Sequence, residues 1–130
     1  MTNLEPGAEL DAAVATALGW RKVRISENNS EAVCGIPPDV PLYESALQVE
    51  NWRFIPPYST SPGDAIAALE EFRRTPGYEA NIRAWSNGEY RVCIKDIKTL
   101  QRVEAETDTL PHAICLAILK AHEKLKGAES

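Results

Sequence analysis

Residues 56–72 read PPYSTSPGDAIAALEEF and decide the fold, because a rigid turn runs directly into a well-signalled amphipathic helix. Ser61 is a natural N-cap, since its side-chain oxygen can accept a hydrogen bond from a free N–H in the first helical turn. Pro62 suits the first helical position, where a missing N–H removes no hydrogen bond. Asp64, three residues after Ser61, fits a capping box and the positive end of the helix dipole. A helix is therefore expected over residues 62–75.

Two further helices are expected on either side of this segment. Apolar residues recur every four positions from Leu10, which predicts a helix over residues 8–19. The last helix is expected over residues 110–125. Its stretch 113–119 is apolar almost all round, so this helix should be the most buried one.

An antiparallel meander is expected over residues 79–106, with its third strand at about 101–106. A three-residue loop at 86–88 gathers the apolar residues on one face, whereas a two-residue loop would mix the two faces. The strand pairs that this loop predicts are Ala84–Tyr90, Ile82–Val92 and Ala80–Ile94. Shorter strands are expected at 21–25 and 46–54, in a proline-rich region without a long period.

The length and composition fit a single small domain over residues 1–130, and the expected helices and strands make it an α/β domain. Hydrophobic content is 44% and charged content 25%, as in ordinary globular proteins. The net charge of −5 argues against binding to bulk DNA or RNA, although a small anionic ligand can still be held by a few local arginines. No apolar run approaches the roughly 20 residues of a membrane span, and the N-terminus lacks a signal-peptide pattern. We therefore expect residence in the cytoplasm and no membrane partner.

We expect no metal site, no cofactor and no enzymatic activity. The chain has three cysteines, an odd number spaced far apart, which argues against a disulfide framework. His112 and His122 lie ten apart on one expected helix, so they point in different directions and are poor joint metal ligands. There is no glycine-rich phosphate loop, no G-x-S-x-G and no H-E-x-x-H. The sequence thus favours a protein that binds rather than catalyses.

Three segments of the chain resemble the phage ABA-sandwich domain family. They are Gly19-Trp20, Pro56-Pro57-Tyr58-Ser59-Thr60 and Pro111-His112-Ala113-Ile114-Cys115-Leu116-Ala117. The resemblance implies a phage or prophage origin and a three-layer α/β/α sandwich, with a small antiparallel β-sheet flanked by helices. Two departures stand out: Ser61-Pro62-Gly63 precedes the acidic residue of the helix, and Leu69 stands where a tryptophan is common. In size and layering the chain is also distantly similar to Thoeris anti-defence proteins, oligomers that sequester cyclic nucleotide signals.

The first candidate ligand surface is the polar face of the meander, with Trp85 between Arg83 and Arg91. A flat indole can stack a nucleobase, and guanidinium groups match phosphate oxygens bidentately. The alternative is structural. Arg91 would then pair across strands with Glu104 or Glu106, while Trp85 packs under a helix or a partner chain.

Two further candidate sites lie at helix starts. Tyr58, Ser59 and Thr60 precede a helix N-terminus, where free N–H groups attract anions. The alternative is capping with core packing by Tyr58, because Asp64 in the first turn would repel a phosphate. His112 is a candidate phosphate ligand or base, with a purely structural histidine as the alternative.

Two functions from different classes are therefore expected. The first is a homo-oligomeric phage accessory protein that sequesters a small cyclic nucleotide immune signal in the host cytoplasm, without catalysis. The alternative is a protein-interaction module that inhibits a host factor and takes no small ligand, with the aromatic, proline-rich region 37–60 as its contact surface. Trp20 is expected in the core or at an interface. Nucleotide hydrolysis from the His112 end is a third interpretation.

Overall fold

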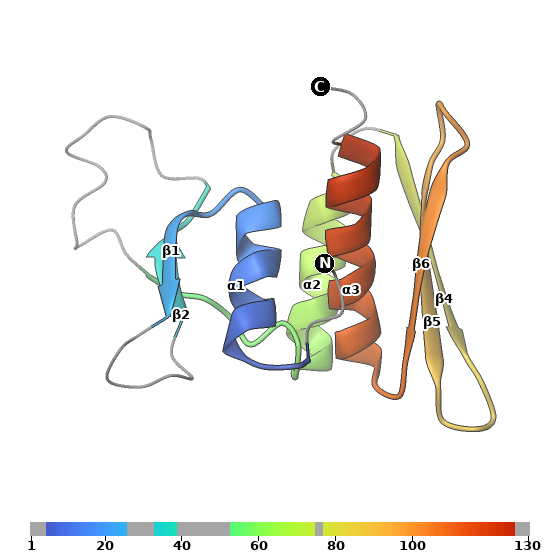
Figure 1. The fold of residues 1–130 in the computed structure, drawn as a ribbon, viewed down its shortest axis with the longest axis horizontal. Helices are drawn as coiled ribbons and strands as arrows, with labels where there is room; N and C mark the ends of the chain where they lie inside the picture. Colours follow the sequence, from blue (N-terminus) through green and yellow to red (C-terminus); the bar gives the residue numbers. More distant parts are fainter. Residues whose placement is uncertain (1–4, 26–32, 39–52, 75–76, 127–130) are drawn as a thin grey trace.

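The computed structural model describes residues 5–25, 33–38, 53–74 and 77–126. In this part of the chain, three α-helices lie between two small antiparallel sheets (Figure 1). None of these helices has the length and apolar character that crossing a bilayer requires.

The first helix and the first sheet come from the N-terminal half of the chain. Helix α1 (Ala8–Ala17) ends near Gly19, whose φ of 101° is one that glycine adopts without strain. The N-terminal sheet has the order β1 (Arg21–Ile25), β2 (Val33–Ile36), β3 (Arg53–Phe54). The expected helix and the strand at 21–25 are confirmed, while β2 was not predicted. Of the strand expected at 46–54, residues 46–52 lie outside the described residues.

Helix α2 (Pro62–Arg73) begins as its sequence predicts. The Asp64 N–H donates to Ser61 Oγ at 3.4 Å, so Ser61 is the N-cap and Pro62 is the first helical residue. At the other end, the Phe72 ring stacks on Tyr78 of the next strand, with ring centroids 5.3 Å apart. This stack ties the end of α2 to the start of the second sheet.

The C-terminal sheet has the order β4 (Tyr78–Ala84), β5 (Tyr90–Asp96), β6 (Arg102–Thr107). The predicted register is confirmed: Ala84 pairs with Tyr90, Ile82 with Val92 and Ala80 with Ile94. Gly88 closes the three-residue loop with φ 89°, a left-handed conformation. The third strand lies one residue later than expected.

Helix α3 (Leu110–Ala121) continues into a π-helical turn (His122–Lys126). It packs on β5 and β6 on one side and against α1 and α2 on the other. Ile114 and Ile118 are fully buried. Contact on both sides explains why the sequence of this helix is apolar almost all round, and it confirms α3 as the most buried helix.

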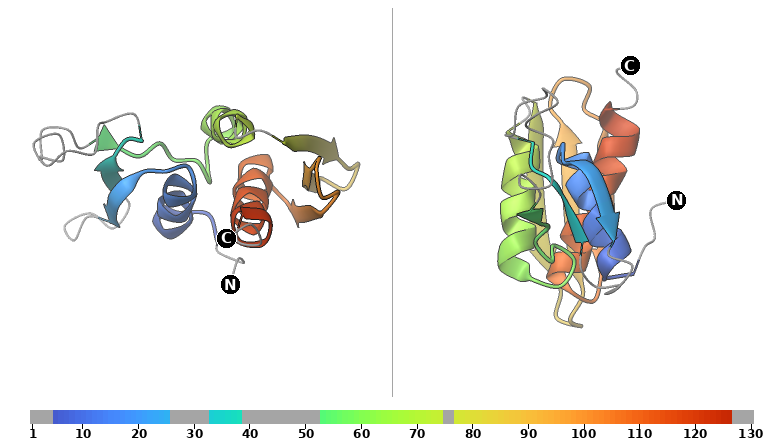
Figure 2. Two further views of the ribbon diagram at one scale, coloured as in Figure 1. Left: turned by 90° about the horizontal axis from the view of Figure 1, so that it is seen from above. Right: turned by 90° about the vertical axis from the view of Figure 1, so that its left-hand side faces the viewer.

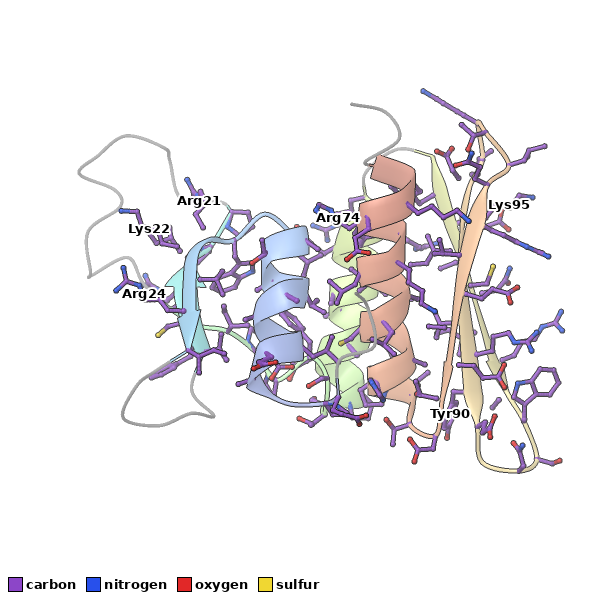
Figure 3. The ribbon with its side chains drawn as sticks, viewed as in Figure 1. Arg21, Lys22, Arg24, Arg74, Tyr90 and Lys95 are labelled. Atoms are coloured by element: carbon purple, nitrogen blue, oxygen red, sulfur yellow. The ribbon has the colours of Figure 1, made fainter. Side chains whose placement is uncertain are left out.

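The mixed α/β class is confirmed, but the layers run sheet, helices, sheet (Figure 2). The expected order had helices on both sides of one sheet. The difference arises because β1–β3 form a second sheet that covers α1. Each sheet then presents its other face outward. The alternating polar residues of β5 lie on such an outer face, and Lys95 points away from the helices (Figure 3).

Candidate functional site

A hollow of about 460 Å³ opens where the end of α1, the N-terminal sheet and α2 meet. We call it the Trp20–Tyr58 hollow after its two aromatic side chains. The other described residues that line it are Leu18, Pro37, Pro38, Pro56, Asp64, Ala67, Ala68, Glu71 and Arg74. Its volume is within the range of small-molecule and peptide side-chain pockets.

The two aromatic residues are fixed by the chain turns that carry them. The backbone N–H of Trp20 donates to the Ala15 carbonyl at 3.0 Å, which fixes the backbone of Trp20 at the end of α1. The Tyr58 N–H donates to the Pro56 carbonyl at 2.8 Å. Burial raises the pKa of the Tyr58 phenol to about 12, although its side-chain hydrogen bond with Trp20 acts in the opposite direction. Both rings are therefore held in place before any ligand arrives.

Helix α2 supplies one charged side of the hollow. Glu71 follows Asp64 by two helical turns, and Arg74 follows Glu71 by three residues. These spacings place the three side chains on one face of the helix. Arg74 Nη1 lies 3.3 Å from Glu71 Oε2, so this pair neutralises itself. Asp64 and Glu71 also raise the pKa of Tyr58, less than burial does. The charges of the described residues that line the hollow thus sum to one negative charge.

The structure separates the three residues of the predicted Tyr58–Ser59–Thr60 site. Only Tyr58 lines the hollow. Ser59 is buried and faces α1: its hydroxyl accepts from the Gly7 N–H at 2.8 Å, and its own N–H donates to Asp11 Oδ1 at 2.7 Å. Thr60 is exposed, and its hydroxyl lies 3.5 Å from the Pro57 carbonyl. The geometry favours the structural interpretation for Ser59.

The predicted Trp85 surface lies on the outer face of the C-terminal sheet. Trp85 is 41% exposed, and the Arg91 guanidinium carbon is 5.3 Å from its ring centroid. Arg83 is exposed and stands opposite Arg91 in the ladder. The structure therefore brings all three predicted residues together.

Carboxylates also occupy that surface. Arg91 Nη2 lies 3.0 Å from Glu106 Oε2, which is one of the two ion pairs that the structural interpretation predicted. The hydrogen bond from Arg91 holds the pKa of Glu106 below its usual value. Glu89 hydrogen-bonds to the same carboxylate, and this contact raises the pKa of Glu89. One of the two arginines is thus already paired, and a second acid lies beside the pair.

His112 occupies the first turn of α3, where the sequence predicted a helix start, and only 9% of it is exposed. It is not among the residues that line the Trp20–Tyr58 hollow. Within the described ranges, no group of three or more histidines, cysteines and acids is placed to hold a metal ion. All three cysteines are free thiols.

A second hollow, of about 570 Å³, lies between β6 and the end of α3. The described residues around it are Arg102, Val103, Glu104, Lys120, Glu123 and Lys124, none of them aromatic. Lys120 Nζ donates to the Glu104 carbonyl at 2.9 Å, so it already has a partner. We therefore place the candidate site in the Trp20–Tyr58 hollow.

The chain matches no protein-family model, no curated protein and no solved structure. The resemblance to the phage ABA-sandwich domain family accordingly stays a prediction. Two segments that carry it contribute to the hollow, Gly19-Trp20 through Trp20 and residues 56–60 through Pro56 and Tyr58. Sequence reasoning assigned Trp20 to the core or an interface and missed that it joins Tyr58. The signal that could have found it was the shared membership of both segments in that resemblance.

Proposed function

We propose that this protein is an interaction module that binds an extended, proline-containing, basic segment of a partner protein in the Trp20–Tyr58 hollow. The observation that carries the proposal is the joining of an indole, a phenol and three proline rings around one hollow with a net negative rim. This is the protein-interaction role expected from the region 37–60. A host factor is the partner that this role implies.

The lining supports an extended peptide. Grooves that recognise proline-rich segments are lined by aromatic side chains, because proline rings pack flat against them and the ligand loses little entropy. Trp20 is partly exposed and offers such a surface. Tyr58 lines the same hollow but is 6% exposed, so only a small part of its ring is open to a ligand. A pocket of this kind accepts a proline or an aliphatic side chain.

The charge supports a basic residue next to that side chain. Asp64 and Glu71 line the hollow, and Arg74, the one cation among its described lining residues, is paired with Glu71. The Arg21 guanidinium lies next to the hollow, where it donates to the Pro37 carbonyl at 2.7 Å. A phosphate would be repelled by these carboxylates, whereas a lysine or arginine would be attracted. Figure 3 shows Arg74 at the end of α2, where such a segment would leave the hollow.

A displayed library of random peptides, selected on the immobilised full-length protein, tests the proposal. Enriched peptides should combine proline or an aliphatic residue with lysine or arginine. Trp20→Ala should weaken their binding at least about tenfold, since a buried aromatic contact at an interface is typically worth 2 kcal/mol or more. Asp64→Asn keeps the size of the side chain and should reduce only the preference for basic residues.

Arg83→Ala on the far sheet is the matched control and should leave peptide binding unchanged. Enrichment of acidic peptides, or of none, would contradict the proposal. So would peptides whose affinity is insensitive to Trp20→Ala.

The Trp85 surface supports a second candidate, the sequestering of a small cyclic nucleotide. The specific observation in its favour is a guanidinium 5.3 Å from an indole, with Arg83 next in the ladder. Against it stands the ion pair between Arg91 and Glu106. The hollow is therefore the first choice.

Calorimetry with a panel of cyclic nucleotides tests this second candidate, followed by heating to release the ligand. Release of unchanged nucleotide indicates sequestration, and release of an altered one indicates an enzyme. Glu106→Gln should tighten binding because it frees Arg91, while Arg83→Ala should weaken it. Absence of binding heat across the panel would remove this candidate and leave the peptide proposal untouched.

A further inference from the structure

We infer that two copies of this chain associate through the free edge of β4, forming a continuous six-stranded antiparallel sheet. The interface is symmetric, with Asn81 of each copy on the two-fold axis. This inference goes beyond the binding role above and does not depend on which ligand is bound.

The first observation is a regular strand edge that, from Ala80 to Ala84, has no ladder partner among the described residues. Strand β4 is at the end of the C-terminal sheet, and its seven residues pair with β5 without a bulge. It contains neither proline nor lysine, the residues with which proteins commonly block exposed edges. Among the described residues, nothing else forms a ladder with this edge.

The backbone direction along β4 follows from its hydrogen bonds to β5. The Trp85 N–H donates to the Glu89 carbonyl at 2.8 Å, and the Ile97 N–H donates to the Gly77 carbonyl at 2.7 Å. Backbone groups alternate in direction along an antiparallel strand, so the odd-numbered residues face β5. The even-numbered residues of β4 therefore turn their N–H and C=O groups to the free edge. Of these, Ala80, Ile82 and Ala84 belong to the proposed interface.

One register makes this edge complementary to itself. With Asn81 opposite Asn81 of the second copy, Glu79 of each copy stands opposite Arg83 of the other. The same register pairs Ala80 of each copy with Ile82 of the other, and both residues have edge-facing backbone groups. A shift by two residues would lose both Glu79–Arg83 pairs. Charge complementarity thus selects one register, and directly opposite charges stabilise a cross-strand pair.

The inner face of the proposed interface is apolar. Ile82 lies on the same face as the buried Val92, yet 44% of it is exposed, because α3 packs on β5 and β6 rather than on β4. Ile66 of α2 is 43% exposed. At about 100° per residue it lies roughly 160° around α2 from the hollow-lining residues Asp64 and Ala68. Strand β4 contacts α2 (Figure 2), so a second copy paired along β4 would cover apolar surface on strand and helix together.

The opposite edge of the same sheet is formed by β6, and a lysine side chain covers part of it. The backbone carbonyl of Glu104 in β6 points away from β5, toward the edge of the sheet, and accepts a hydrogen bond from Lys120 Nζ at 2.9 Å. A lysine at an edge disfavours pairing with another strand. The chain therefore protects β6 and leaves β4 open, which is what a closed two-fold dimer requires.

Charge reversal of the full-length chain tests the register, with sedimentation equilibrium as the measurement. The wild type should be a dimer. Glu79→Arg and Arg83→Glu each place like charges opposite each other and should raise the dimer dissociation constant at least about tenfold. A mixture of the two single variants should form a heterodimer, because each chain then meets its complement. The double variant, carrying both changes, should dimerise like the wild type.

Arg102→Glu is the matched control, since it changes the net charge equally on the outer face of β6 and should not affect association. A second measurement uses Asn81→Cys in a Cys93→Ser background, because Cys93 lies opposite Asn81 on β5. Opposite residues on the axis approach within disulfide range, so oxidation should give a covalent dimer. In the proposed register, position 79 of one copy stands opposite position 83 of the other, four residues along the strand from position 79 of that copy. Glu79→Cys in the same background should therefore give no covalent dimer.

Several results would overturn the inference. They are a wild type that stays monomeric at all concentrations, a dimer that ignores both charge reversals, and single variants that fail to associate with each other. Failure of peptide or nucleotide binding would leave it standing, since neither enters these measurements.

Discussion

Ser59 is a buried side chain that fastens the turn before α2 to the start of α1. Its hydroxyl accepts from the Gly7 N–H at 2.8 Å, and its N–H donates to Asp11 Oδ1 at 2.7 Å. The sequence offered a ligand role and a structural role for this residue, and the geometry favours the second. The difference between the two roles is measurable because only the structural one affects folding.

Ser59→Ala should lower the free energy of unfolding by about 1–2 kcal/mol, since it leaves the Gly7 N–H without its acceptor. Urea denaturation measures this. Thr60→Ala, at an exposed position with a weak 3.5 Å contact, is the control and should change stability by less than about 0.5 kcal/mol. Unchanged stability in Ser59→Ala, together with lost ligand binding, would return Ser59 to the list of ligand residues.

Tyr58 makes stability depend on pH in the alkaline range. Its pKa is raised by burial from 10.0 to about 12, so the folded state keeps the proton that the unfolded state releases. The stabilisation is complete below pH 10 and is lost as pH rises from 10 to 12. Two pKa units correspond to about 2–3 kcal/mol.

Urea midpoints between pH 8 and pH 12 should therefore fall more steeply in the wild type than in Tyr58→Phe. Absorbance at the tyrosinate band should show one phenol ionising late in the wild type and missing in the variant. Identical pH dependence in both proteins would contradict the buried, neutral phenol.

At the scale of elements, the hairpin loop is the clearest case in which sequence determines geometry. Gly88 has φ 89°, and a Cβ placed there would meet nothing within 4 Å. Any cost of a side chain is therefore conformational and not steric. Gly63, in the first turn of α2, is equally uncrowded but has no positive φ.

Gly88→Ala should destabilise the protein by about 1–2 kcal/mol, because alanine is strained in the left-handed region. Gly63→Ala should stabilise it by roughly 0.4–1 kcal/mol through the lost entropy of the unfolded chain. Thermal unfolding of the pair measures both. Equal shifts in the same direction would contradict the loop geometry.

The length of chain that carries each signal explains which parts of the fold could be predicted from the sequence. Helices α2 and α3 and the β4–β5 register carry their signals within a few turns or one hairpin, and those predictions were confirmed. Strand β2 has only four residues, too few for a period to mark it, and its partner β3 is distant in the chain. The hollow was missed for the same reason, because its two rings come from separate segments.

At the scale of the whole molecule, the two sheets are attached to the helices unequally. The C-terminal sheet has strands of seven, seven and six residues and packs directly on α3. The N-terminal sheet has strands of five, four and two residues and packs mainly on α1. Local stability follows the buried apolar contacts of each unit, so the N-terminal sheet should open first.

Native-state hydrogen exchange at increasing urea concentration tests this order on two central strands, β2 and β5. The amides of β5 around Val92 should exchange only through global unfolding, with a strong dependence on urea. Those of β2 around Cys34 should exchange through a smaller opening that depends less on urea and has a lower free energy. Pro37 and Pro38, which follow β2, line the hollow, so a peptide bound there should slow exchange in β2 and not in β5. Equal protection of both strands would show that the sheets unfold as one unit and that the hollow does not depend on a separately opening sheet.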